Sequence, residues 1–132
     1  MRNQAQGRWG EDLAARQLES EGWKIVGRNV RPFFFDRRCE IDLIARQADG
    51  IAFVEVKTRR TRTAWSPALL GVDRRKKKVL LKACGAWLRK AKWDGNFRFD
   101  VVEITGEEGS PMPPVIEHYE NVPLFPYRFR FR

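Results

Sequence analysis

The chain has 132 residues, which suits one domain with a single sheet and a few helices around it. Lysine and arginine number 26 against 17 aspartates and glutamates, and this net charge of +9 favours a polyanionic partner, either nucleic acid or an anionic membrane surface. Two cysteines and one histidine exclude a zinc-ligand spacing and a disulfide framework, and the absence of a long apolar run argues for a cytoplasmic protein without a signal sequence or membrane span.

Residues 8–21 carry the first helical pattern. Apolar residues recur there at helical spacing, at Trp9, Leu13, Ala14 and Leu18, and Gly22 suits the end of the helix. Glu11 lies at the edge of this apolar stripe. A glutamate in the first turn of a helix is favoured by the helix dipole, so its position alone indicates a stabilising role. Residues 23–30 follow as a first strand, and residues 31–38 as a loop.

Residues 39–45 and 51–57 are apolar and β-branched, with a hairpin turn signal at Asp49-Gly50 between them. Because side chains alternate along a strand, Asp42 shares its face with Glu40 and Ile44, and Glu55 shares its face with Lys57. If two residues form the turn, Asp42 stands opposite Lys57, and the residue numbers of each facing pair add up to 99. If four residues form the loop, they add up to 97, and Asp42 stands opposite Glu55. Both registers keep Asp42, Glu55 and Lys57 on one face.

An ordinary salt bridge across a solvated face is the simplest explanation for these three ionisable groups. Ile44, Ile51 and Phe53 fall on the same face, however, and burying an unpaired carboxylate costs several kcal/mol. We therefore expect a sheet whose buried half opens into a polar cleft, where the acids pair with the lysine or bind a cation.

Asp42 followed by Glu55-x-Lys57 resembles the signature of the restriction-endonuclease-like nucleases. A wider set of residues, in order and spacing over about residues 7–120, resembles the bacterial YraN family: Gly10-Glu11, Arg28-Asn29, residues 40–44, residues 53–57, Arg59, Lys76 and residues 98–104. This resemblance implies an α/β fold with a restriction-endonuclease-like core, a mixed central sheet flanked by helices. It implies nuclease chemistry by analogy with the archaeal Holliday-junction resolvases, to which the family is related in fold.

The resemblance also implies a catalytic set, namely Glu11, Asp42, Glu55 and Lys57. Asp42 and Glu55 would hold Mg²⁺ or Mn²⁺ with Glu11 as a third metal ligand, and Lys57 would position the attacking water or stabilise developing charge. Glu40, one step outward on the Asp42 face, is a candidate for orienting these ligands. The expected activity is metal-dependent cleavage of structured or branched DNA. The alternatives are a nucleic-acid-binding module without turnover and an interaction protein that meets an acidic partner.

Charge is segregated along the chain. Residues 57–92 hold thirteen lysines and arginines and one acid, whereas residues 93–122 hold seven acids and one arginine. A field of one sign steers polyanions, so we expect nucleic-acid contacts, to DNA rather than RNA, from a loop at 58–65 and the first turns of a helix capped by Asp73: Arg59, Arg60, Arg62, Arg74, Arg75, Lys76, Lys77 and Lys78. Lys76 falls on the lysine of the YraN family, and the related resolvases suggest a homodimer.

The last third of the chain predicts strands at 97–105 and 115–119, joined by a hinge at 106–114. Asp100 lies inside an apolar strand and requires a partner, for which Arg28 or Arg59 is expected. The single domain would span residues 1–132, with flexible or arm-like tails at 1–7 and 121–132. The alternating aromatic and basic residues from Tyr127 onward suit a disordered end, an edge strand, a dimer arm or a tail that stacks on bases.

Overall fold

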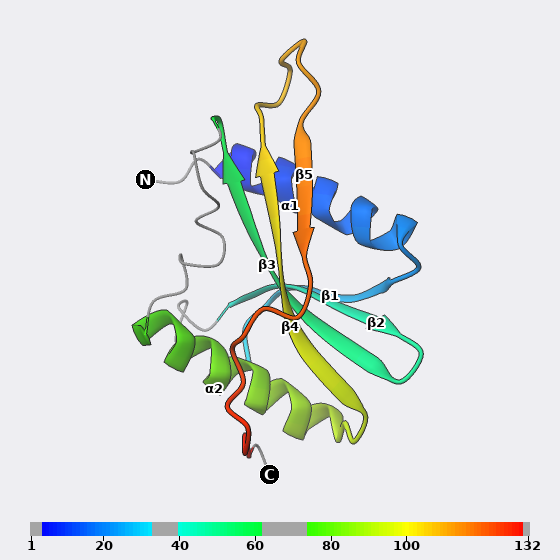
Figure 1. Cartoon of the computed structure of the whole chain (residues 1–132), viewed down its shortest axis with the longest axis vertical. Coiled ribbons are helices and arrows are strands. Elements are labelled where there is room, and N and C mark those ends of the chain that lie inside the picture. Colours follow the sequence, from blue (N-terminus) through cyan, green and yellow to red (C-terminus); the bar gives the residue numbers. More distant parts are fainter. Residues whose placement is uncertain (1–3, 33–39, 62–73, 131–132) are drawn as a thin grey trace.

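The computed structural model describes residues 4–32, 40–61 and 74–130. Its elements are α1 (Gln4–Ser20), β1 (Lys24–Val30), β2 (Ile41–Gln47), β3 (Gly50–Arg59), α2 (Arg74–Ala91), β4 (Asn96–Thr105) and β5 (Val115–Tyr119). The strands form one five-stranded sheet in the order β1-β2-β3-β4-β5, in which only the β3–β4 pair is parallel. The two helices lie apart with strands between them (Figure 1). This confirms the predicted α/β fold with a mixed central sheet flanked by helices.

α1 covers one face of the sheet. Its small residues Ala14 and Ala15, together with Leu18, pack against the strand residues of that face: Leu43, Ala45, Ala52, Val54, Val56, Val102 and Ile104. The helix comes closest to the sheet at Gly10, where an added Cβ would collide with the side chain of Thr58 on β3. Burial of this apolar face sets the height and direction of α1 above β3.

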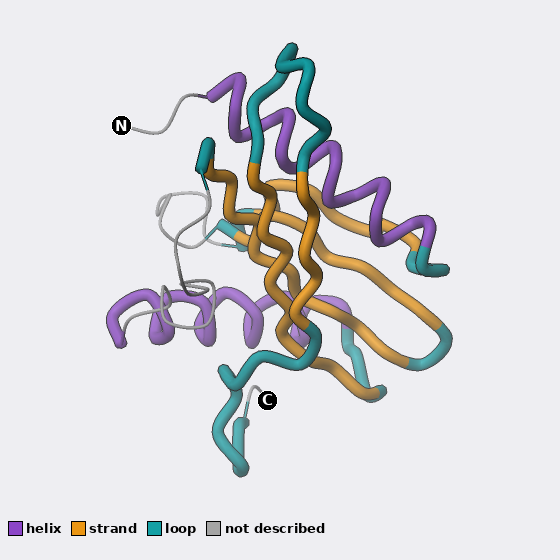
Figure 2. The backbone as a smooth tube through the Cα atoms, turned by 45° about the horizontal axis from the view of Figure 1, so that its top comes forward, coloured by secondary structure: helices purple, strands orange, loops and turns teal. Residues whose placement is uncertain are grey.

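α2 covers the opposite face through Leu80, Ala83, Cys84 and Leu88, which pack against Ile44, Ile51, Phe53, Phe99 and Val101. Figure 2 shows the two helices on opposite sides of the strands. α2 stands between β3 and β4 in the chain, and these two neighbouring strands are parallel. Since side chains alternate along β3, Glu55 and Lys57 continue the face that begins with Ile51 and Phe53. The apolar part of this face therefore runs into ionisable residues, as the sequence predicted.

The β2–β3 hairpin turns one residue earlier than predicted. Gln47 pairs with Gly50, so the turn residues are Ala48 and Asp49, and Ala48 takes up the left-handed backbone with φ of 51°. The predicted turn at Asp49-Gly50 is wrong because Gly50 belongs to the strand. The resulting register pairs Leu43 with Val54. Of the two registers derived from the sequence, it is the one that brings Asp42 beside Glu55.

Other boundaries also differ from the sequence predictions. α1 begins at Gln4, four residues before the predicted start, so Glu11 lies in the second turn rather than the first. α2 is described from Arg74 to Ala91. Asp73 itself, Arg62 and the aromatic loop fall outside the described residues. Among the described residues, no helix has the length and apolar character needed to cross a membrane.

Several residues beyond β5 pack against the domain, so the described part of the arm predicted at 121–132 is anchored rather than free. Val122 and Leu124 are buried in the core beneath α2, and the Val122 N–H donates a hydrogen bond of 2.7 Å to the carbonyl oxygen of Phe99. Phe125 packs edge-on against Phe97, with ring centroids 4.9 Å apart. Tyr127 is 99% exposed. At the other end, the expected tail at residues 1–7 overlaps the first turn of α1.

Candidate metal-binding site

Three carboxylates converge where the amino-terminal half of α1 meets the start of β2. Glu11 of α1, Glu40 just before β2 and Asp42 of β2 each offer an oxygen, and these oxygens all lie within 4.8 Å of one another. Adjacent oxygen ligands in an octahedral Mg²⁺ site, each about 2.1 Å from the ion, lie about 3.0 Å apart, so side-chain shifts of about 1 Å would close the set. Hard divalent cations prefer such oxygen donors. The donor set fits Mg²⁺ or Mn²⁺.

Asp42 is fixed by the backbone of the neighbouring strand. Its Oδ2 accepts a hydrogen bond of 2.8 Å from the Val56 N–H of β3. This charge-assisted bond lies just beyond Leu43–Val54, the last of the described β2–β3 pairs. The strand pair itself thus sets the direction of the Asp42 carboxylate.

Glu11 is only 7% exposed and is held from β1. Asn29 Nδ2 donates a hydrogen bond of 3.0 Å to Glu11 Oε1, and Arg28 Nη2 lies 4.0 Å from the same oxygen. Arg28 also binds Asp12 Oδ1 over 2.7 Å. These contacts explain why Arg28-Asn29 accompanies Gly10-Glu11 in the sequence pattern, because the pair orients and partly neutralises a buried acid.

Glu40 is the ligand candidate that sequence reasoning placed only in an orienting role. Its Oε2 lies 2.8 Å from Arg31 Nε, and its side chain is partly exposed. The structure places Glu40 beside Glu11 and Asp42, and these three residues form the acid cluster. Its position two residues before Asp42, on the same face of a strand, was the available signal.

Glu55 belongs to the other side of Asp42. Its Oε1 forms an ion pair with Lys76 Nζ from α2, whereas its buried Oε2 has no hydrogen-bond partner among the described residues. A cavity of about 10 Å³ is lined by both Asp42 and Glu55 and otherwise mainly by apolar side chains. That volume suits about one water molecule. The structure therefore brings Glu55 near Asp42 but not into the acid cluster.

Lys57 is half-buried next to Glu55. Burial lowers the pKa of Lys57, and the Lys76 and Arg59 cations lower it further. The attraction of the Glu55 carboxylate opposes this shift. Glu103, which stands beside Lys57 in the parallel β3–β4 register, also opposes this shift. A lysine with a lowered pKa gives up its proton more readily near neutral pH than an exposed lysine does.

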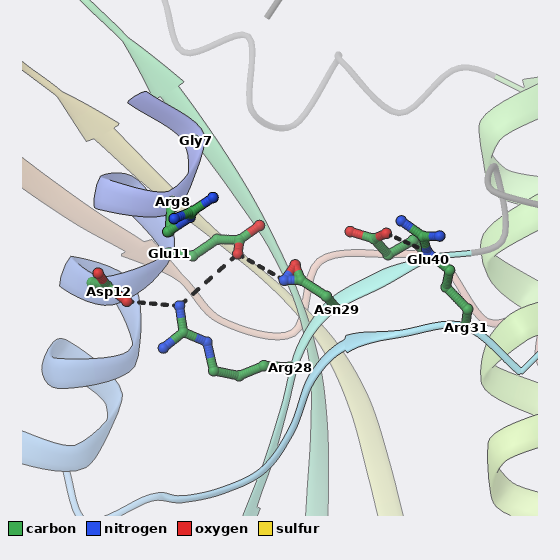
Figure 3. A pocket seen from close by; sticks show the side chains of 8 residues that line it. All are labelled: Gly7, Arg8, Glu11, Asp12, Arg28, Asn29, Arg31 and Glu40. Atoms are coloured by element: carbon green, nitrogen blue, oxygen red, sulfur yellow. Dashed lines mark hydrogen bonds and ion pairs between the residues drawn. The ribbon is translucent and has the colours of Figure 1, made fainter. Parts of the chain in front are cut away.

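A groove of about 710 Å³ opens beside the acid cluster (Figure 3). Residues of α1, β1 and the segment before β2 line it: Gly7, Arg8, Glu11, Asp12, Arg28, Asn29, Arg31 and Glu40. Arg28 and Arg31 are paired with acids across the groove (Figure 3). Arg8 has no ion pair within the described ranges. Arg8 is a groove residue that sequence reasoning missed, since a lone arginine on a helix gives no signal.

The predicted nucleic-acid-binding residues occupy two places. Arg59 ends β3 and Arg60 follows it, with Arg60 Nε 3.8 Å from Glu107. The five others that are described occupy the first turns of α2, where Arg74, Arg75 and Lys78 are exposed: Arg74, Arg75, Lys76, Lys77 and Lys78. Of these, Lys76 is the one that an ion pair ties to a predicted catalytic residue.

Asp100 is part of a separate buried network, and the predicted partners Arg28 and Arg59 are wrong. It accepts hydrogen bonds from Arg98 at 3.0 Å, from the Asn121 N–H at 2.9 Å and from His118 at 2.7 Å. The other ring nitrogen of His118 lies 2.7 Å from Glu21 Oε1. The network joins β4, β5 and the end of α1, so its role is structural.

Comparison with known proteins gives one consistent result. A family model described as "Uncharacterised protein family UPF0102" matches residues 10–104, a span that includes Glu11, Glu40, Asp42, Glu55 and Lys76. A UPF0102 protein of Geobacter sulfurreducens is 45% identical over 113 residues, covering 85% of this chain and 83% of the relative. A UPF0102 protein of Trichlorobacter lovleyi is 40% identical over 121 residues, 90% of each chain, and one of Rhodococcus jostii is 44% identical over 118 residues, 88% of this chain and 93% of the relative.

Proposed function

The chain belongs to the UPF0102 family, also known as YraN, and from this premise we propose that it is a metal-dependent nuclease acting on structured or branched DNA. The observation that carries the proposal is the convergence of Glu11, Glu40 and Asp42 beside a groove that Glu11 and Glu40 line together with Arg8. A set of oxygen donors beside a groove arginine suits a divalent ion together with a phosphodiester.

Glu11, Glu40 and Asp42 would hold Mg²⁺ or Mn²⁺, with Glu55 on the far side of Asp42 as a further donor. When bound, such an ion neutralises phosphate oxygens and lowers the pKa of water. Asn29 and the Val56 N–H keep two of the carboxylates in position. Lys57, whose pKa is lowered by burial, is placed to hold or pass a proton near Glu55.

The substrate strand would enter along the groove, with its backbone phosphates near Arg8 and the acid cluster. The basic first turns of α2 would hold the adjoining part of the DNA, in keeping with the net charge of +9. Branched DNA presents two strands for cleavage, and a homodimer would supply two such sites.

The test is cleavage of a four-way junction, a flap and a duplex of matched sequence, with Mg²⁺, with Mn²⁺ and with chelator. We expect ion-dependent cleavage that falls by about a hundredfold or more in Asp42→Asn, because a ligand charge is lost while the shape is kept. Glu19→Gln on the exposed side of α1 is the matched control. Cleavage that survives Asp42→Asn, or that proceeds in chelator, would reject the proposed site.

A nucleic-acid-binding module without turnover is the second candidate. One observation favours it: Lys76 already neutralises Glu55, and the cavity between Asp42 and Glu55 suits about one water molecule. This alternative predicts DNA affinity that falls steeply with salt, no cleavage with either ion and little effect of Glu55→Gln on binding.

A further inference from the structure

Lys76 and Glu55 form an ion pair that joins the start of α2 to the candidate metal site. We propose that Lys76 is the internal counter-ion of this site: a divalent cation displaces it from Glu55, and the freed ammonium then binds a phosphate of the DNA. Cation and DNA therefore bind with positive coupling. The inference rests on the proposed function and adds a link between its two ligands.

The Glu55 carboxylate needs a positive partner. Its side chain is only 11% exposed, and one of its oxygens is buried without a hydrogen bond from any described residue. An unpaired carboxylate in such a place is costly, so a cation must stay close to it. The cation that the structure places in contact with Glu55 is the Lys76 ammonium.

Lys76 is well placed to dissociate from Glu55. Its side chain is 42% exposed, so its ammonium can return to water without the penalty that holds a buried lysine in place. It is the third residue of α2, where the helix dipole disfavours a cation and favours an anion. The pair with Glu55 offsets that cost in the metal-free protein, and a phosphate would offset it once Glu55 has another partner.

Coupling follows from this exchange. A divalent cation on Glu55 stabilises the state in which Lys76 is released, and a phosphate stabilises the same state. Each ligand must then raise the affinity of the other by the same factor, for which about tenfold is typical. Lys76→Met should remove the competitor, so that cation affinity rises while DNA affinity and its dependence on the cation both fall.

The experiment compares Mn²⁺ binding by calorimetry in the full chain and in Lys76→Met, with Lys78→Met as the control of equal charge in the same helical turn. Affinity for a junction that carries non-hydrolysable linkages is measured with and without Mn²⁺. We expect Lys76→Met to bind Mn²⁺ about five- to tenfold more tightly than Lys78→Met and to lose the Mn²⁺-induced gain in DNA affinity, which Lys78→Met keeps. Equal Mn²⁺ affinities in the two variants, or an undiminished gain in Lys76→Met, would overturn the exchange.

Glu55→Gln provides a second test that does not depend on the stability of Lys76→Met. It removes the Glu55 carboxylate from Lys76 without adding an ion, so metal-free Glu55→Gln should bind the junction more tightly than the metal-free unaltered protein and more tightly than Glu19→Gln does. No gain over Glu19→Gln would contradict the exchange. Failure of the proposed function has a different signature, since the unaltered protein would then bind no Mn²⁺ at all.

Discussion

The backbone N–H of Val56 donates a hydrogen bond of 2.8 Å to Oδ2 of Asp42. In an antiparallel pair that N–H would ordinarily seek a carbonyl of the neighbouring strand, but a side-chain carboxylate takes its place here. The acid is therefore positioned by main-chain geometry, which a change of side chain elsewhere disturbs little.

Asp42→Asn tests this arrangement together with the metal site. The amide oxygen can still accept from Val56, so the melting temperature without metal should change little. The carboxylate charge is lost, so the stabilisation given by Mn²⁺ should disappear, whereas a saturated native site gains about 2.7 kcal/mol at one hundred times its Kd. Thermal unfolding with and without Mn²⁺ measures both effects. Full Mn²⁺ stabilisation in Asp42→Asn would exclude Asp42 as a ligand.

Glu40→Gln separates a metal ligand from a plain partner of Arg31. Loss of a ligand or of its support should weaken Mn²⁺ binding about 10- to 100-fold. Glu19→Gln, on the exposed surface of α1, carries the same change of charge. Calorimetry that gave one affinity for both variants would leave Glu40 with only its ion pair to Arg31.

Arg8→Gln tests the groove as the path of the DNA strand. If Arg8 contacts one phosphate, the variant should bind DNA more weakly at low salt, and the slope of log affinity against log salt should fall by about one. Arg16→Gln changes the same charge on an exposed position of the same helix and should keep the original slope. Fluorescence anisotropy across a salt series gives both slopes, and identical ones would remove Arg8 from the binding path.

His118 predicts a pH dependence of stability. Hydrogen bonds that the His118 ring donates to Asp100 and Glu21 raise its pKa above the ordinary value of 6.5, against the opposing effect of burial. A raised pKa means that the folded state holds the proton more tightly, so this stabilisation is complete below the unfolded pKa and is lost as pH rises through the folded pKa. Melting temperatures should fall across that window in the native protein and fall less in His118→Gln. Arg98 and Glu120 also belong to this network. Parallel curves for the two proteins would remove His118 as the source of the pH dependence.

Gly10→Ala tests the close approach of α1 to β3. The new methyl group would overlap Thr58, and overpacking of this kind costs about 1–3 kcal/mol. Adding Thr58→Ala removes the nearest atoms and should recover part of the loss. Denaturant titration of the two single variants and the double variant gives the coupling energy. An additive result would show that α1 shifts freely.

Much of the site follows from local pattern. Alternation along β2 and β3 placed Asp42, Glu55 and Lys57 on one face, and helical spacing placed Glu11 at the edge of an apolar stripe, although its place in the second turn was missed. The turn at Ala48-Asp49 was not predictable from the Asp-Gly signal, because strand pairing extended to Gly50 and overrode local turn preference.

Contacts between distant segments account for the rest. The pairing of Glu55 with Lys76 depends on how α2 docks, and the burial of Asp100 against His118 and Arg98 depends on the pairing of β4 with β5. Glu40 joins the acid cluster because α1 descends beside β2 at that point. No pattern within one element carries such information.

The packing of Val122, Leu124 and Phe125 against the α2 side of the sheet has a consequence for biosynthesis. While the ribosome has delivered the chain only as far as β5, Phe99 lacks the main-chain donor from Val122, and Phe53 and Phe97 lack Phe125 as a cover. Apolar surface exposed at that stage invites aggregation and attracts chaperones. Premature termination after residue 120 should thus yield an aggregation-prone, short-lived product rather than a folded but shorter domain.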